Sequence, residues 1–407
     1  MDQRVASNDH PAMGLTGWPR TTLIVIMLWL CGAALRLTVL AIPPLIPDIH
    51  RDIGLGETGI GILSSLPSLM FAWAAILGSL MVARFGMLRT LIFGLVVGAL
   101  AGALRGAATE PFFLYATTVA MALGLSVMQP ALPPVVRAWM PTRIGLGTSI
   151  YSNGWLVGEI LAVWLTIPYV LPLLGGSWRW SLVLWSAPVL LTALLVLGFA
   201  PRPRLAPRPP LALRHWWPDW RQWSLWRMGL IMGGANVAYW GSNAFIPDFL
   251  THVGRPELIA VTLTALNLGQ LPLSLMLLVW AGYLAGRAWP LIAMGACILV
   301  GLLGMVVAND AIWIELGAGL VGFACAGILI LQLTVPPLIC ATEDVARTTA
   351  GMFVVGYSCS VIVPIIGGAV WDATHSPYPV FALIAASAIG TLILPRTVVN
   401  DAAAEPD

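Results

Sequence analysis

The sequence contains no lysine, and all 20 of its basic residues are arginine. A nucleotide-binding loop of the Walker A type needs a lysine on the phosphates, and a retinal Schiff base needs a lysine amine, so both are excluded. Charge of either sign is scarce, since 9% of the 407 residues are charged, against about a quarter in soluble globular proteins. This composition is therefore not that of a water-soluble globular protein.

Cysteine and histidine are few and form no ligand pattern. The five cysteines lie inside apolar stretches without CxxC spacing, and the five histidines form no HExxH motif. The cysteines are expected to be small core residues. We expect no metal site, no cofactor and no enzymatic activity, and no nucleic-acid partner.

Long apolar runs fill most of the chain. Hydrophobic residues make up 59% of it, and its mean hydropathy is +0.89. Apolar runs of about 18 residues or more are typical of membrane-spanning helices. Twelve such helices are predicted, at residues 22–47, 58–82, 89–108, 112–138, 145–171, 180–200, 226–250, 257–284, 289–308, 312–340, 348–370 and 378–395.

Two short motifs occur twice, about 200 residues apart. Ile46-Pro47-Asp48 recurs as Ile246-Pro247-Asp248, and Gln129-x3-Pro133-Pro134 recurs as Gln332-x3-Pro336-Pro337. The repeats predict an all-α membrane protein whose twelve transmembrane helices form two related six-helix bundles. Parallel halves of this kind are typical of secondary transporters, whose binding sites lie where the halves meet, near the bilayer midplane. The prolines are predicted to break helical hydrogen bonds at matching places in the two halves, and either a bent helix that lines a cavity or a static kink would account for them.

The boundary between the halves is a proline- and arginine-rich stretch that begins at Pro201 and cannot form a membrane helix. The chain is thus divided into an N-terminal tail (1–21), a first bundle (22–200), a linker (201–225), a second bundle (226–396) and a C-terminal tail (397–407). With the N-terminus inside, fifteen arginines fall in inner segments and only Arg51, Arg105, Arg179 and Arg255 in outer loops. This bias predicts that both termini face the cytoplasm of an inner membrane.

Two ionisable residues, Arg36 and Glu159, lie deep inside apolar spans. Their spans run in the same direction, and each residue lies 14 positions past the start of its span, so a mutual ion pair is geometrically reasonable. Three interpretations are open. Arg36 binds an anionic group of a substrate while Glu159 is its counter-ion or proton carrier, or the two form a structural salt bridge, or they act independently.

Buried polar side chains without charge form a second candidate set. An amide inside a span faces either a neighbouring helix or water, so each is explained by a helix–helix hydrogen bond as well as by a ligand contact. The densest cluster lies on the seventh span, the repeat partner of the span that holds Arg36. The substrate contacts expected besides Arg36 are Gln129, Asn236, Tyr239, Asn243, Gln332 and Tyr357.

Several motifs resemble those of the major facilitator superfamily, and within it the cyanate and 2-nitroimidazole transporter family. They are Leu35-Arg36, Pro44-Leu45-Ile46-Pro47-Asp48-Ile49, Gly61-Ile62-Leu63-Ser64-Ser65-Leu66-Pro67, Arg84-Phe85-Gly86, Leu132-Pro133-Pro134-Val135-Val136-Arg137, Trp178-Arg179-Trp180 and Gln270-Leu271-Pro272. The resemblance covers nearly all of residues 20–396. It implies uptake or efflux of small anions or small polar heteroaromatic compounds by alternating access, with Arg36 as a substrate contact.

The chain departs from the family pattern at four positions. Ala83 replaces an acidic residue of a gating salt bridge, Gln129 stands where asparagine is expected, Arg137 where lysine is expected, and Glu159 where the family is small and apolar. The function predicted is secondary transport of a small anionic or polar organic solute by a monomer, with proton coupling through Glu159 as a hypothesis. The alternative is export of neutral or aromatic compounds, with Arg36 and Glu159 as a structural pair.

Overall fold

The computed structural model describes residues 18–54, 57–201 and 216–395, and within these ranges it contains helices and no strand. The first half contains α1 (Trp18–Leu40), η1 (Pro43–Leu45), α2 (Ile46–Ile53), α3 (Glu57–Trp73), α4 (Ala75–Phe85), α5 (Met87–Leu104), η2 (Arg105–Ala107), α6 (Pro111–Met128), η3 (Gln129–Ala131), α7 (Leu132–Trp139), α8 (Ile144–Leu165), η4 (Thr166–Val170), α9 (Leu171–Leu173) and α10 (Trp178–Phe199). The second half contains α11 (Trp223–His252), η6 (Pro256–Leu258), α12 (Ile259–Leu268), α13 (Gln270–Leu284), α14 (Ala288–Val307), α15 (Ala311–Ile339), α16 (Val345–Thr374) and α17 (Tyr378–Ile393).

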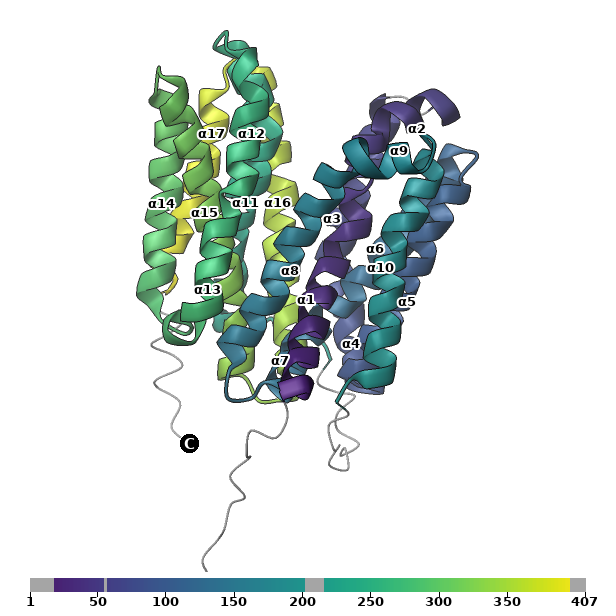
Figure 1. Cartoon of the computed structure of the whole chain (residues 1–407). Coiled ribbons are helices and arrows are strands. Elements are labelled where there is room, and N and C mark those ends of the chain that lie inside the picture. The colour runs from purple at the N-terminus through teal and green to yellow at the C-terminus, as the bar shows by residue number, and fades with distance from the viewer. Residues whose placement is uncertain (1–17, 55–56, 202–215, 396–407) are drawn as a thin grey trace, which may run out of the picture.

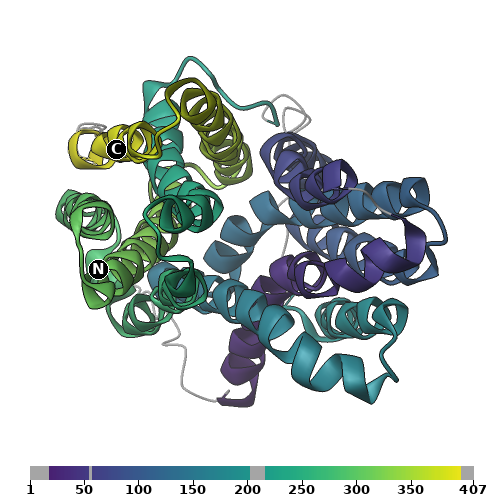
Figure 2. The same ribbon diagram turned by 90° about the horizontal axis from the view of Figure 1, so that it is seen from above.

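The helices form two bundles that lie side by side. Figure 1 shows α1 to α10 on one side and α11 to α17 on the other, and Figure 2 shows the same separation from above. The two bundles come closest at the end where α1 begins and α7 lies, and their ribbons diverge towards the end that carries α2 and α9. Of the predicted tails and linker, residues 1–17, 202–215 and 396–407 lie outside the described residues.

Most of the predicted membrane helices are present. Within the described ranges, nine helices are long and apolar enough to cross a membrane, and a tenth span is formed by α3 and α4, whose axes bend by 47° at their junction. The two other predicted spans correspond to α17, a shorter apolar helix, and to the 30-residue α11, whose middle carries Asn236, Tyr239 and Asn243. The prediction of an all-α membrane protein is confirmed.

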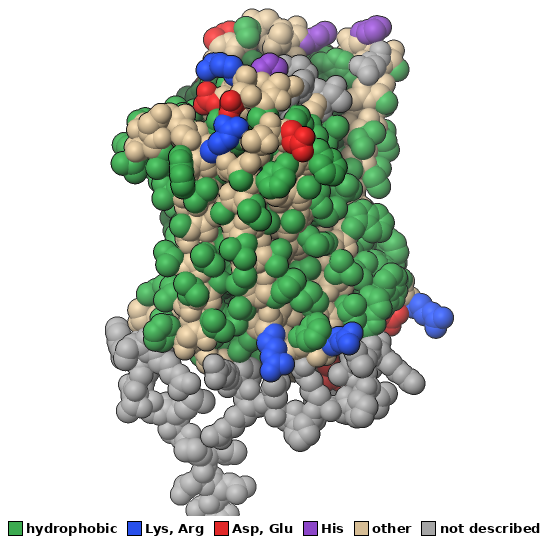
Figure 3. All heavy atoms as spheres, turned by 90° about the vertical axis from the view of Figure 1, so that its right-hand side faces the viewer, with side chains coloured by type: hydrophobic (Ala, Val, Ile, Leu, Met, Phe, Trp, Pro, Cys, Tyr) green, Lys and Arg blue, Asp and Glu red, His purple; other side chains and the backbone are tan. Residues whose placement is uncertain are grey.

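The surface is apolar over the depth that lipid would cover. Figure 3 shows a broad belt of hydrophobic side chains across the middle of one face, with charged side chains gathered towards its two ends. Several leucines of α5 and α10, such as Leu100, Leu191 and Leu197, are more than half exposed. Such a belt is unfavourable in water and matches a bilayer core.

The repeated motifs take different local structures in the two halves. The Gln129 motif interrupts its helix, which passes through η3 into α7, whereas α15 continues through Pro336 and Pro337. The prolines thus coincide with a break in the regular helix in the first half, whereas the helix continues through them in the second half. The first copy carries an extra proline, Pro130, directly after Gln129, and each proline removes one more backbone donor from the helix.

Helices α1 and α8 cross at very short range because glycines line their contact. A side chain at Gly32 would overlap the carbonyl of Tyr151, and one at Gly154 would overlap the carbonyl of Trp29. Small residues allow membrane helices to approach backbone to backbone. One turn farther along this contact, α1 carries Arg36 and α8 carries Glu159, so the packing brings the two ionisable groups together.

Candidate functional site

Arg36 and Glu159 face each other at the centre of the molecule. The Nε atom of Arg36 lies 3.8 Å from Oε2 of Glu159, and their side chains are 6% and 13% exposed. This separation is longer than a charge-assisted hydrogen bond of about 2.7–2.9 Å. Among the described residues, Nε of Arg36 has no hydrogen-bond partner. The two groups are neighbours, but they do not form a tight salt bridge.

Aromatic rings surround the guanidinium group of Arg36. Its central carbon lies 4.5 Å from the ring centroid of Trp155, 5.3 Å from that of Phe71 and 5.8 Å from that of Trp240. Cations are attracted to the faces of aromatic rings at such distances, and more so where water is excluded. The rings therefore stabilise a buried positive charge without using its N–H donors.

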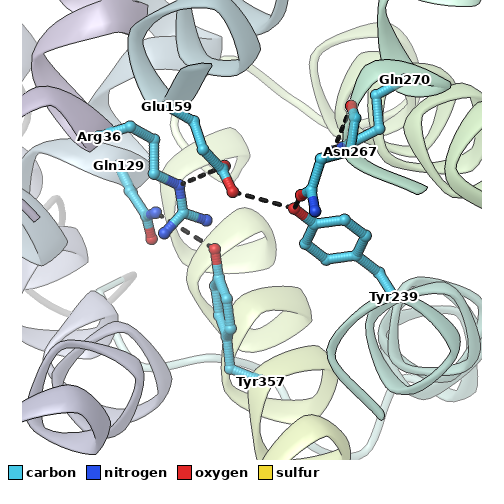
Figure 4. Close-up of polar contacts among 7 residues, drawn as sticks. All are labelled: Arg36, Gln129, Glu159, Tyr239, Asn267, Gln270 and Tyr357. Carbon is cyan, nitrogen blue, oxygen red and sulfur yellow. Dashed lines mark hydrogen bonds and ion pairs between the residues drawn. The ribbon is translucent and has the colours of Figure 1, made fainter. Parts of the chain in front are cut away.

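The second half supplies a hydrogen-bonded chain that reaches Glu159. The Tyr239 hydroxyl lies 2.9 Å from Oε1 of Glu159 and 2.5 Å from Oδ1 of Asn267. Asn267 donates to Oδ1 of Asn243 at 3.1 Å, and Asn243 donates to the backbone carbonyl of Tyr239 at 3.0 Å. Figure 4 shows Arg36 and Glu159 on one side and Tyr239 with Asn267 and Gln270 on the other. This series of hydrogen bonds joins α8 of the first bundle to α11 and α12 of the second.

A second bridge between the halves contains Tyr357 of α16. Its ring stacks on Phe71 with centroids 5.9 Å apart, and Gln129 approaches its hydroxyl at 3.5 Å. Figure 4 shows this hydroxyl pointing towards the guanidinium group of Arg36. The positively charged group is therefore approached by side chains from both bundles.

A small cavity lies between these side chains. The space between the lining atoms is about 410 Å³, of which the centre of a water molecule can occupy about 30 Å³. By that measure one water needs about 10–15 Å³, so in this conformation there is room for a solute of only a few non-hydrogen atoms. The lining residues are Arg36, Trp155, Leu156, Glu159, Ala235, Asn236, Tyr239, Trp240, Gln270, Cys325, Leu329 and Tyr357.

The structure brings most of the predicted site residues together. Arg36, Glu159, Asn236, Tyr239 and Tyr357 line the cavity. Two others contact residues of the site instead. Gln129 approaches the hydroxyl of Tyr357, and Asn243 is hydrogen-bonded to the backbone of Tyr239 and to the side chain of Asn267. Gln332 lies elsewhere, because its amide is buried inside the second bundle and donates to the carbonyl of Met228 at 3.2 Å.

Phe71, Asn267 and Gln270 belong to the site but are not among the predicted substrate contacts, although Asn267 and Gln270 are polar residues inside a predicted span. Asn267 and Gln270 are two amides three positions apart in one apolar span, so they share a helix face. Phe71 is one of many apolar residues in its span and carries no such signal. Nowhere in the described ranges do three or more His, Cys, Asp or Glu side chains gather as a metal site would require.

Two helical bundles related by a sequence repeat, with an ionisable site buried between them, are typical of membrane transporters. The family model described as "Major Facilitator Superfamily" matches residues 28–368, so the chain belongs to this superfamily. Its members are transporters and not enzymes. The chain is accordingly a multi-pass membrane protein that moves a solute across a membrane.

Three curated relatives align with most of the chain. An uncharacterized transporter of Bacillus subtilis (strain 168), YycB, is 26% identical over 86% of this chain and 87% of its own length. The 2-nitroimidazole transporter of Escherichia coli (strain K12) is 25% identical over 88% and 90%. The cyanate transport protein CynX of the same organism is 21% identical over 91% and 96%. The resemblance to the cyanate and 2-nitroimidazole transporters is confirmed.

Solved structures agree with the fold. The crystal structure of the transporter FucP in its outward conformation has a TM-score of 0.70 with this chain, at 16% identity, and covers 93% of this chain and 98% of FucP. At this level of identity the similarity establishes the fold alone. Together with the all-helical structure of the described residues, it confirms the predicted major facilitator architecture.

Proposed function

We propose that this protein is a secondary transporter for a small anionic or polar, planar organic solute. The observation that carries the proposal is the guanidinium group of Arg36, which lies in a cavity lined from both halves and has an Nε without a hydrogen-bond partner among the described residues. A charge at membrane depth is costly unless it serves a partner. An anion that binds there contacts both bundles, as alternating access requires.

The cavity also favours a small and flat solute. Its walls combine one guanidinium group with the rings of Trp155, Trp240, Tyr239 and Tyr357. Guanidinium N–H groups bind anions and nitro-type oxygens, and ring faces stack on planar π systems. The names of two relatives mention cyanate, a three-atom anion, and 2-nitroimidazole, a planar heteroaromatic compound. Both kinds of solute suit such a site.

Several finer features are part of the proposal. The weak Arg36–Glu159 contact of 3.8 Å supports a binding role for Arg36 over a structural salt bridge. Glu159 is the acidic side chain of this cavity, and we assign proton coupling to it. We place the protein in the inner membrane with both termini in the cytoplasm, on the strength of the arginine bias. One chain holds a complete cavity, so a monomer suffices for transport.

A thermal-shift screen tests the proposal. Purified protein and the Arg36→Gln variant are heated with cyanate, acetate, benzoate and 2-nitroimidazole, each over a range of concentrations. A ligand that binds only the folded state raises the unfolding midpoint by mass action. Stabilisation by the anions in the unmodified protein, and none in Arg36→Gln, is the expected result. Equal stabilisation of both proteins by neutral compounds alone would instead favour an exporter of neutral or aromatic compounds, in which Arg36 and Glu159 are a structural pair.

A further inference from the structure

The Tyr239 hydroxyl group is close to more acceptors than it can serve. It carries one proton, yet it lies 2.9 Å from a carboxyl oxygen of Glu159 and 2.5 Å from the side-chain oxygen of Asn267. A hydroxyl donates one hydrogen bond and accepts up to two. One of the two contacts must therefore be made with a proton that comes from the other partner.

The orientation of Asn267 decides which contact uses the tyrosine proton. The Asn267 amide nitrogen lies 2.8 Å from the backbone carbonyl of Leu263 and 3.1 Å from Oδ1 of Asn243. The Asn243 amide nitrogen lies 3.0 Å from the backbone carbonyl of Tyr239. Backbone carbonyls only accept, so both amides are fixed with their nitrogens towards these carbonyls. Asn267 thus presents an oxygen to Tyr239 and must accept the tyrosine proton.

The remaining contact then requires a proton on Glu159. If the carboxyl group is protonated, it donates to the Tyr239 oxygen, which donates to Asn267, which donates to Asn243. If it is ionised, two oxygens without a proton between them face each other at 2.9 Å. We infer that Asn267 is a positioning residue that turns the Tyr239 hydroxyl into an acceptor for protonated Glu159, so that this contact between the halves forms only while Glu159 holds its proton. This inference rests on the proposed role of Glu159 in proton coupling.

The other groups around Glu159 fit this assignment. The titratable or charged side chains that line the same cavity are Arg36 of α1, Tyr239 of α11, Cys325 of α15 and Tyr357 of α16. Arg36 is the one that favours an ionised carboxylate, yet its Nε stays 3.8 Å away and makes no hydrogen bond to Glu159. When the proton passes from Glu159 to water, the carboxylate is expected to leave Tyr239 and pair with Arg36. The hydrogen-bonded link between α8 and α11 is then lost.

Infrared titration of the purified full-length protein tests the inference without any solute. The C=O band of the protonated Glu159 carboxyl is assigned as the band that Glu159→Gln lacks, and its loss is followed as the pH rises. In Tyr239→Phe the neutral acid loses its acceptor, so we expect the pH of half-loss to fall by about one unit. In Asn267→Ala the tyrosine is free to donate to the carboxylate, and the pH of half-loss is expected to fall as well.

Even if Asn267→Ala fails to fold, Tyr239→Phe alone tests the inference, through the direction in which its pH of half-loss changes. A rise would mean that Tyr239 donates to an ionised Glu159, and it would overturn the inference, as would an unchanged value. Asn153→Ala is the matched control, because this buried amide lies on α8 but bonds to Trp29 and Ser274 instead; its half-loss pH is expected to match that of the unmodified protein. Failure of the anion screen would leave these shifts untouched, so the two proposals fail separately.

Discussion

Arg36 combines a charge with a flat shape that its surroundings use. The guanidinium carbon lies 4.5 Å from the Trp155 ring centroid and 5.3 Å from that of Phe71. Lysine would keep the charge but lose the planar stacking and the fork of N–H donors. We expect Arg36→Lys to weaken binding of an anion such as cyanate by about tenfold, and Arg36→Gln by about a hundredfold. Isothermal titration calorimetry measures both.

Arg84→Lys is the control for this pair of variants. Arg84 lies at the end of α4, is exposed and sits over the ring of Phe85. Anion affinity is expected to stay the same in Arg84→Lys. If Arg36→Lys bound the anion as well as the unmodified protein, charge alone would suffice at this position, and the aromatic rings would have no part in holding the guanidinium group.

The proposed role of Glu159 predicts that anion binding depends on pH. The hydrogen bonds around Tyr239 match a protonated carboxyl beside the guanidinium group, so the anion-bound site is expected to hold one proton and one anion together. Where free Glu159 is ionised, each further unit of pH should lower anion affinity by up to about tenfold. Where it is already protonated, the affinity should not change. Glu159→Gln has no carboxylate to protonate, so it should bind the anion with little dependence on pH.

Binding curves at a series of pH values, together with proton uptake in weakly buffered solution, check this expectation. The unmodified protein should take up protons when the anion is added at a pH where Glu159 is ionised. If Glu159→Gln kept the full pH dependence, the proton would reside on another group and the assignment of coupling to Glu159 would fail.

At the scale of helices, the contact between α1 and α8 positions Arg36 and Glu159. A methyl group at Gly158 would come within 2.8 Å of the backbone of Ala33, which cannot move aside as a flexible side chain can. Gly158→Ala should therefore push α1 and α8 apart, destabilise the protein by about 1–3 kcal/mol and separate Arg36 from Glu159. Thermal unfolding in detergent measures the first effect, and anion affinity the second.

The control for this substitution is Gly198→Ala on α10, where nothing lies within 4 Å of the added atom. Its unfolding midpoint is expected to equal or slightly exceed that of the unmodified protein, because alanine favours the helix more than glycine does. If Gly158→Ala and the unmodified protein had equal unfolding midpoints, the α1–α8 contact would accommodate the added methyl group without loss of stability.

Helices α7 and α15 are joined by an arginine at the end where the bundles approach. Arg137 donates a 2.6 Å hydrogen bond to the carbonyl of Cys340, which is the C-terminal capping residue of α15. The carbonyl end of a helix attracts cations. The two residues occupy equivalent places in the sequence repeat, since both follow the paired prolines by the same spacing. The arginine of one half thus caps the corresponding helix of the other half.

Breaking this contact should open that end of the protein. Arg137→Gln loses a charged hydrogen bond, and we expect the half-buried Cys340 thiol to react about tenfold faster with a membrane-impermeant maleimide. Labelling is followed by mass spectrometry, with Cys340→Ser as the blank and Arg137→Lys as the variant that keeps the charge. An unchanged rate would show that the Arg137 contact does not hold this end closed.

At the scale of the whole molecule, the arginine distribution predicts orientation. The end where the two bundles approach carries Arg84, Arg137 and Arg347 in the described part of the chain, and we expect it to face the cytoplasm. A green fluorescent protein fused to the C-terminus should fluoresce, and alkaline phosphatase inserted beside Glu110 should be active. The opposite pattern for the two reporters would reverse the predicted orientation.

The sequence by itself determined the membrane class, the positions of the helices and their division into two halves. Apolar run length marks a span because the bilayer has a fixed thickness. Repeated motifs such as Ile46-Pro47-Asp48 and Ile246-Pro247-Asp248 mark the halves because duplicated segments keep some residues in common. Equal depth made a contact between Arg36 and Glu159 geometrically reasonable, since counting residues along a straight helix measures height in the membrane.

Only the tertiary structure decided which side chains share the cavity. Gln129 and Gln332 occupy equivalent places in the repeat, yet Gln129 approaches Tyr357 across the halves, and Gln332 turns inward to the carbonyl of Met228. Depth along a helix can be counted, but rotation about its axis cannot. In a lipid-exposed bundle almost every face of a helix is apolar, so no polar stripe records which side faces its neighbours. Packing between helices sets that rotation, and through it brings Tyr239, Asn267 and Glu159 into one hydrogen-bonded chain.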